Sequence, residues 1–307
     1  MADITCRDFC ITISKCLDEY YDKVYDKDAN QNYNEEFISN GFYDQDLLTE
    51  TERENRFLQE YNPSFSMTNK EYIDSVICNW QVDEVVEAIN IFTNELPSNI
   101  PAFLYTLATE KLNAKEFFTE MYESKKESLK IDTYAKEVDK NDIINTDAII
   151  KLFELFTNIS ADYFDIAVDA IKINNKNNDT IIEVVINYMC SINPERVFEL
   201  LKQDFFVKET KMIALNLLAE TEYKSEELYQ TLRSMFKNAA SNGEKLEMFI
   251  TLGLYGNPRA IPMLKKFLRD VYGDHIVPPK DQQERNTLLT MFNIITDLGG
   301  SVEDLIS

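Results

Sequence analysis

The sequence predicts an all-α protein, and three observations carry this prediction. From residue 160 onward, apolar residues recur at helical spacing in segments of 11 to 17 residues, each bounded by a short polar turn. No segment alternates apolar and polar residues over the length of a strand. Six of the seven glycines follow residue 240, so turn residues concentrate near the C-terminal end. We therefore expect helices throughout and no sheet of three or more strands.

The helices expected in the C-terminal half follow from this spacing. Residues 179–192 carry apolar side chains almost all round, which is typical of a helix buried on most sides. The expected helices span residues 161–173, 179–192, 194–206, 209–220, 225–239, 244–255, 258–271 and 282–298.

These helices form pairs with a period near 32 residues. The first helices of successive pairs are expected to start near Ala161, Pro194, Ser225, Pro258 and Ser301. The spacings are 33, 31, 33 and 43 residues, and the last is longer because the loop 273–281 (GDHIVPPKD) is inserted. A two-helix repeat of this length is the signature of an α-solenoid, in which stacked pairs bury one another's apolar faces.

The stretch 252–264 (LGLYGNPRAIPML) joins two of these pairs. Gly253 is expected to let neighbouring helices approach closely, and Gly256 to end a helix with a positive φ. Pro262 is expected to bend the following helix. Asn193-Pro194 and Asn257-Pro258 both open a first helix, because Asn suits the N-cap and proline suits the first turn.

This stretch resembles the join between two HEAT repeats of the kind found in bacterial HEAT-like proteins. Leu298-Gly299-Gly300 echoes it and is expected to begin a truncated final repeat. The resemblance covers residues 160–307 at most. It implies an α-solenoid that holds another protein, since HEAT-like solenoids mostly do this. It also leaves open an enzyme on a HEAT-like scaffold, such as an alkylpurine DNA glycosylase or a bilin lyase.

The N-terminal half is expected to be helical but less regular. One amphipathic helix is expected to run to about residue 26, with Ile13, Leu17 and Tyr21 on its apolar face. Further helices are expected at 37–61 with a break near Gly41, then at 70–80, 82–96, 101–112 and 115–124. The charged stretch 125–141 is the best internal boundary. It separates an acidic, aromatic-rich region, 1–130, from the HEAT-like region, 146–307, unless the two form one continuous solenoid.

The net charge of −23 is concentrated in the N-terminal two thirds. Residues 1–200 hold 39 acidic and 18 basic residues, whereas residues 201–307 hold 15 and 13. Such a field attracts basic partners and repels nucleic acid and anionic membranes, or it serves solubility. Without a secretory signal or an apolar run long enough to cross a membrane, the chain is expected to be cytoplasmic.

The cysteines and the segment 26–37 (DKDANQNYNEEF) are the candidate metal sites in the sequence. An odd count of five cysteines predicts free thiols, buried or half-buried, in a reducing compartment. Asp26, Asp28, Asn30 and Asn32 match alternating positions of a calcium loop. However, the glycine and the bidentate glutamate that such a loop needs are missing, so we expect a polar inter-helix loop and no metal.

Catalytic signatures are absent from the sequence. It has no nucleophile elbow, no phosphate-binding glycine loop and no zinc-protease motif, and His275 is its single histidine. We therefore expect no enzyme activity and no cofactor. The expected function is to bind or inhibit a basic protein, such as a nuclease, a toxin or a nucleic-acid-binding protein. A structural adaptor subunit is the alternative.

Two sets of residues complete the predictions. Acids and tyrosines interleave near the N-terminus, where acids attract a basic partner and tyrosines supply contact area. The expected partner-binding residues are Asp18, Tyr21, Asp22, Tyr25, Asp26, Asp28, Tyr33, Tyr43 and Asp44. The core expected to run through the C-terminal pairs comprises Ile182, Val185, Ile186, Leu215, Leu218, Phe249, Leu252, Phe292 and Ile295.

Overall fold

The computed structural model describes residues 4–32, 50–130, 139–174 and 179–306. Their regular secondary structure is almost all helical, with fifteen α-helices, two short 3-10 helices and one two-stranded hairpin, which confirms the all-α prediction. They form two compact units, one ending at Ile192 and the other beginning at Asn193. The division predicted near residues 125–141 stays a prediction.

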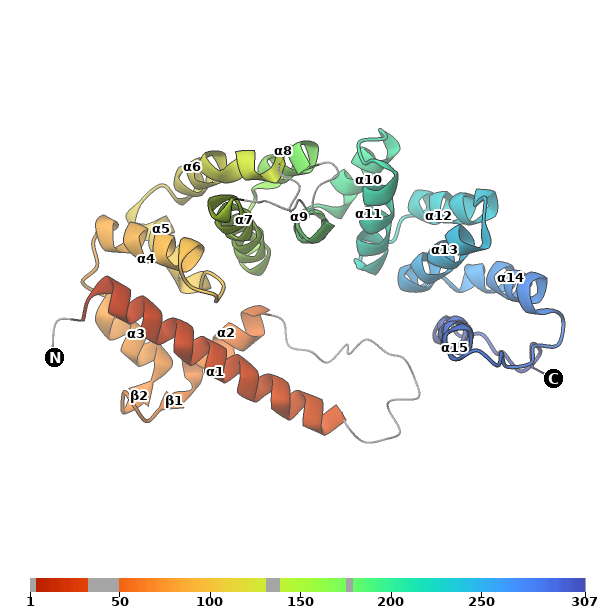
Figure 1. Ribbon diagram of the computed structural model, residues 1–307, viewed down its shortest axis with the longest axis horizontal. Helices are drawn as coiled ribbons and strands as arrows, with labels where there is room; N and C mark the ends of the chain where they lie inside the picture. The colour runs from red at the N-terminus through yellow and green to blue at the C-terminus, as the bar shows by residue number, and fades with distance from the viewer. Residues whose placement is uncertain (1–3, 33–49, 131–138, 175–178, 307) are drawn as a thin grey trace. The chain divides into compact units, whose positions relative to one another are not determined.

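The first unit contains nine of the helices (Figure 1). Their bounds are α1 Cys6–Asn32, α2 Glu50–Gln59, α3 Asn69–Ile77, α4 Val82–Asn94, α5 Ala102–Lys111, α6 Ala114–Lys125, α7 Lys140–Asn158, α8 Phe164–Asn174 and α9 Asp179–Ile192. The hairpin pairs β1, Tyr61–Asn62, antiparallel with β2, Met67–Thr68, and the 3-10 helix η1 covers Lys126–Lys130.

The second unit contains six helices in three consecutive pairs. Their bounds are α10 Pro194–Lys202, α11 Lys208–Glu220, α12 Glu226–Asn238, α13 Asn242–Tyr255, α14 Ile261–Tyr272 and α15 Gln282–Asp297, and the 3-10 helix η2, Pro258–Ala260, precedes α14. Each helix of a pair packs against the other, and α13 also packs against both α11 and α15. The second helices of the pairs therefore form one layer.

The turn chemistry of the second unit is as the sequence predicts for the two Asn caps and for Gly253 and Gly256, but not for Pro262. The side chains of Asn193 and Asn257 cap α10 and η2 by accepting hydrogen bonds from backbone N–H groups. Gly256 ends α13 with a φ of 77°. A Cβ on Gly253 would lie 2.6 Å from Cγ2 of Ile294, so glycine is what lets α13 and α15 approach. Pro262 instead lies in the first turn of α14, where its missing N–H costs nothing.

Several boundaries differ from the prediction. The first helix continues six residues past 26, to Asn32, and the helix expected at 37–61 is described only over Glu50–Gln59. No helix begins at Ser301: the chain turns there and Ile306 forms a bridge with Ile276 of the inserted loop. The long helix α7 was not among the expected helices, although apolar residues recur at helical spacing over its second half.

Burial agrees with eight of the nine expected core residues. Ile182, Val185 and Ile186 are buried in the first unit, and Leu215, Leu218, Phe249, Leu252 and Ile295 are buried in the second. Phe292 is only half-buried. Three of the nine residues belong to the first unit and six to the second, so one core running through all the C-terminal pairs stays a prediction.

Candidate protein-binding surface

The helix α1 carries the part of the expected binding surface that the structure describes. Asp18 and Tyr21 are half-buried, and Asp22 is exposed. Tyr25, Asp26 and Asp28 belong to α1 by its backbone, but their side chains lie outside the described residues, as do Tyr33, Tyr43 and Asp44 entirely. The described surface is thus a pair of carboxylates one helical turn apart, with a tyrosine beside them.

Asp18 is electrostatically the most unusual of these groups. Burial raises the pKa of its carboxyl, and the neighbouring charge of Asp22 raises it further. Within the described part of the chain, neither carboxylate forms an ion pair with a lysine or arginine. A cation placed beside Asp18 would relieve both effects, because an opposite charge favours the ionised carboxylate.

Tyr21 lies beside Glu54, whose carboxylate caps the start of α5. With Leu17 it lines a shallow hollow that also involves Glu54, Ile100 and Pro101. Glu54 is buried, and its carboxylate accepts hydrogen bonds from the backbone N–H groups of Ala102 (2.9 Å) and Phe103 (3.4 Å). These groups begin α5, so a side chain of α2 caps the start of another helix. Sequence spacing gave no signal of this contact.

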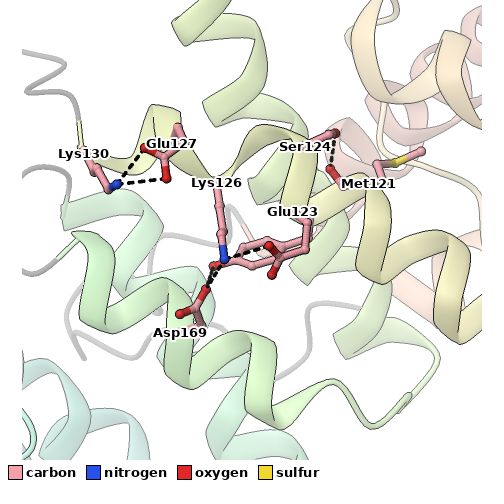
Figure 2. A network of polar contacts seen from close by, with 8 residues as sticks. Met121, Glu123, Ser124, Lys126, Glu127, Lys130 and Asp169 are labelled. Carbon is pink, nitrogen blue, oxygen red and sulfur yellow. Dashed lines mark hydrogen bonds and ion pairs between the residues drawn. The ribbon is translucent and has the colours of Figure 1, made fainter.

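The described start of the charged stretch, η1, is held in place by ion pairs. Figure 2 shows Lys126 pointing between Glu123 of α6 and Asp169 of α8, with Nζ–O distances of 2.7 and 3.4 Å. The hydrogen bond to Glu123 raises the pKa of Lys126, and burial raises that of the Tyr122 hydroxyl, which donates to Asp169. This cluster therefore fixes η1 against two helices and leaves no unsatisfied charge for chemistry.

His275 and the supposed calcium loop show no arrangement that would support catalysis or metal binding among the described residues. His275 is exposed, while the next residue, Ile276, is buried and donates its backbone N–H to the Leu305 carbonyl. The inserted loop is therefore fastened to the C-terminal segment. Asp26 to Asn32 are helical, so the first part of the supposed calcium loop is not a loop. In the described ranges, no three His, Cys, Asp or Glu side chains gather as a metal ion would need.

The five cysteines are free thiols, and one of them corrects the prediction. Cys10 and Cys190 are buried and Cys6 and Cys16 half-buried, but Cys78 is exposed because α3 ends before it. A hydrogen bond from Cys10 lowers the pKa of the Cys6 thiol and raises that of Cys10. The Cys6 thiol also donates to the Glu84 carbonyl of α4, so it ties α1 to that helix.

A hollow of about 210 Å³ in the second unit was not expected from the sequence. Its lining includes the apolar side chains of Phe198, Leu201 and Leu215 and two lysines, Lys202 and Lys211. Both lysines are already paired with carboxylates, Lys202 with Glu199 and Lys211 with Asp204. The hollow therefore presents no free cation to an anionic ligand.

Comparisons with known proteins assign no family to this arrangement, because no protein-family model, no curated protein and no solved structure matches the chain. In the described part of the chain, none of the helices is both long and apolar enough to cross a bilayer.

Proposed function

We propose that this chain is a HEAT-like helical-repeat protein that binds a basic protein partner and inhibits it by covering its positive surface. The observation that carries the proposal is the pair Asp18 and Asp22 on α1, two carboxylates one turn apart that no described lysine or arginine neutralises. A basic side chain would pair with both and would offset the cost of keeping Asp18 ionised in a half-buried position.

Two further features support the proposal. The second unit repeats a helix pair three times and stacks the second helices, which is the packing pattern of a solenoid. The acidic excess of residues 1–200 adds long-range attraction for a basic protein, because charges of one sign steer association over about 10 Å at 0.1 M salt.

The test begins with isolation of the partner from the native host. Its association and dissociation rates are then measured across a salt series. Association should slow steeply with salt, and the variants Asp18→Lys, Asp22→Lys and Asp26→Lys should slow it further. Tyr21→Ala and Tyr25→Ala should mainly speed dissociation, because aromatic contacts act after encounter. An acidic partner, or an association rate that ignores salt, would refute the proposal.

A further inference from the structure

The neighbours of α13 fix which way its side chains face. Gly253 faces α15, since a Cβ there would meet the Ile294 side chain at 2.6 Å. Thr251 faces α11, since its hydroxyl donates to the Asn216 amide oxygen. At about 100° per residue these two positions are about 200° apart, so α15 and α11 cover opposite sides of α13.

A third side of α13 is also covered. Phe249 contacts the ring of Phe267 in α14, and Tyr255 stacks on Tyr229 in α12, with centroids 6.1 and 5.9 Å apart. Leu252, at the middle of this side, is fully buried. One side of α13 therefore remains without a neighbour among the described helices.

That remaining side is apolar. Ile250 and Leu254 lie on it one turn apart, and their exposed fractions are 37% and 38%. On α11, Ile213 and Leu217 lie about 60° and 100° round the helix from Asn216, both on the same side of it, and both are half-buried. We call these four residues the apolar strip. Leaving such side chains in water is unfavourable by about 25 cal/mol per Å² of apolar area, which a bound partner would recover.

The charges around the apolar strip are all of one sign. Glu247 lies one turn before Ile250, and Asp297 of α15 is exposed near the Ile294 contact. The basic residues of these helices are engaged or turned elsewhere. Lys208 pairs with Glu244, Lys211 pairs with Asp204, and Arg285 donates to the Pro279 carbonyl. Lys245 is two residues before Glu247 and hence on the opposite side of α13.

We propose that the apolar strip docks an amphipathic helix of a protein partner whose leucine-type stripe is flanked by lysine or arginine. Spacing of one turn between Ile250 and Leu254 suits the one-turn spacing of apolar residues on such a helix. Glu247 and Asp297 complement its basic flanks. The inference rests on the proposed function only in that the partner is basic, and it places a second contact face on the second unit.

The test uses the full-length chain and a labelled synthetic helix of about 18 residues, five turns, with a leucine stripe and lysine flanks. The double variant Ile250→Ser/Leu254→Ser should weaken binding of this peptide about tenfold, because it removes most of the apolar contact area. Val271→Ser is the matched control: Val271 is 39% exposed on α14, the helix that packs on the buried side of α13, so binding should change less than about twofold.

Two further peptides test the chemistry of recognition. A peptide of the same composition with its leucines shuffled around the helix should bind more weakly, and one with glutamate for lysine should not bind. Equal binding of the shuffled and the unshuffled peptide, or an equal loss of peptide binding in the Val271→Ser control, would overturn the inference. Sedimentation showing a dimer that Ile250→Ser/Leu254→Ser converts to a monomer would also overturn it, since the occupant would then be a second copy.

The same peptide separates this inference from the proposed function. The variant Asp18→Lys/Asp22→Lys should bind the amphipathic peptide as the unchanged chain does. If it loses the peptide while Ile250→Ser/Leu254→Ser keeps it, the α1 surface binds basic helices and the inference fails while the proposed function stands. If the native partner proves acidic but the peptide results are as expected, the proposed function fails and the docking site stands.

Discussion

The two units differ in what holds neighbouring helices together. Both units have apolar cores. In the second unit, Leu218 and Leu252 are fully buried, Gly253 lets α13 meet α15, and no described Asp, Glu, Lys or Arg is buried. In the first unit, polar side chains reach across to the ends of other helices. Glu54 caps the start of α5, and Lys151 of α7 donates to the carbonyls of Phe92 and Leu96 at the end of α4.

This difference has an energetic consequence. Apolar contacts in the second unit are replaceable by other side chains of similar volume, whereas a buried polar cap leaves unsatisfied groups when its partner is removed. The first unit should therefore be more sensitive to changes of chemistry at constant size, and the second to changes of size. The following substitutions test that contrast.

The largest expected effect is that of Leu218→Ala in α11. Leu218 has no exposed surface, so the substitution should lower the free energy of unfolding by about 2–5 kcal/mol through lost burial and a cavity. Urea unfolding measures the change. Leu218→Met, which nearly conserves volume, should cost less than about 1.5 kcal/mol. A change below about half a kcal/mol for the alanine variant would show that Leu218 is not a core residue.

Lys151→Met tests the first unit at nearly constant size. Lys151 is 4% exposed and its ammonium donates to two carbonyls, so methionine should cost about 1–3 kcal/mol by leaving those carbonyls without a donor. The matched control is Lys115→Met on the exposed surface of α6, expected to change stability by less than about half a kcal/mol. If Lys151→Met and Lys115→Met unfold at the same urea concentration, the hydrogen bonds of Lys151 do not stabilise the first unit, and the proposed difference between the units fails.

Gly253→Ala tests close approach in the second unit. The added methyl group would overlap the Ile294 side chain, and relief of that overlap should cost about 1–3 kcal/mol. Gly243→Ala in the same helix is the control, because the nearest atom to its Cβ would be 3.8 Å away. That control should be neutral or stabilising by up to about 1 kcal/mol, since alanine favours the helix. Crowding at Gly253 is disproved if both variants gain stability.

The contrast between the units also explains which contacts could be predicted from the sequence. Asn193, Asn257, Gly253 and Gly256 act on their own turn or on a neighbouring helix of the repeat, so local patterns revealed them. Lys151 acts 59 residues from its partner Phe92, and no local pattern signals such a contact. The helix α7, which contains Lys151, was also missing from the prediction, although its apolar residues recur at helical spacing.

The sequence indicated only one of the two candidate binding surfaces, the one on α1. Interleaved acids and tyrosines pointed to α1, and the structure describes only Asp18, Tyr21 and Asp22 of that set in full. The apolar strip was invisible in the sequence, because Ile250 and Leu254 follow the same helical spacing as buried residues. Only the positions of α11 and α15 on either side of α13 distinguish the exposed side from the buried one.

The smallest expected effect is that of Asp18→Asn on stability. Since burial and Asp22 raise the pKa of Asp18 in the folded chain, its ionised form opposes folding. That cost is present above the folded pKa and disappears as the pH falls through it, when Asp18 takes up a proton. At neutral pH, Asp18→Asn should therefore stabilise the chain, by only a few tenths of a kcal/mol because the half-buried carboxylate is still partly screened by solvent.

Urea unfolding of the unchanged chain and of Asp18→Asn, in steps from pH 7 down to about pH 4, measures the difference in their stability. The lower limit is close to the ordinary pKa of aspartate. The gain from Asp18→Asn should shrink as the pH falls, because the unchanged chain then carries a neutral Asp18 as well. Affinity for a basic partner should follow the opposite course and rise with pH through the same range, since the partner requires the ionised carboxylate. If Asp18→Asn destabilises the chain at pH 7, the Asp18 carboxylate already makes a favourable contact in the folded chain. The proposal that it pairs with a basic partner is then contradicted.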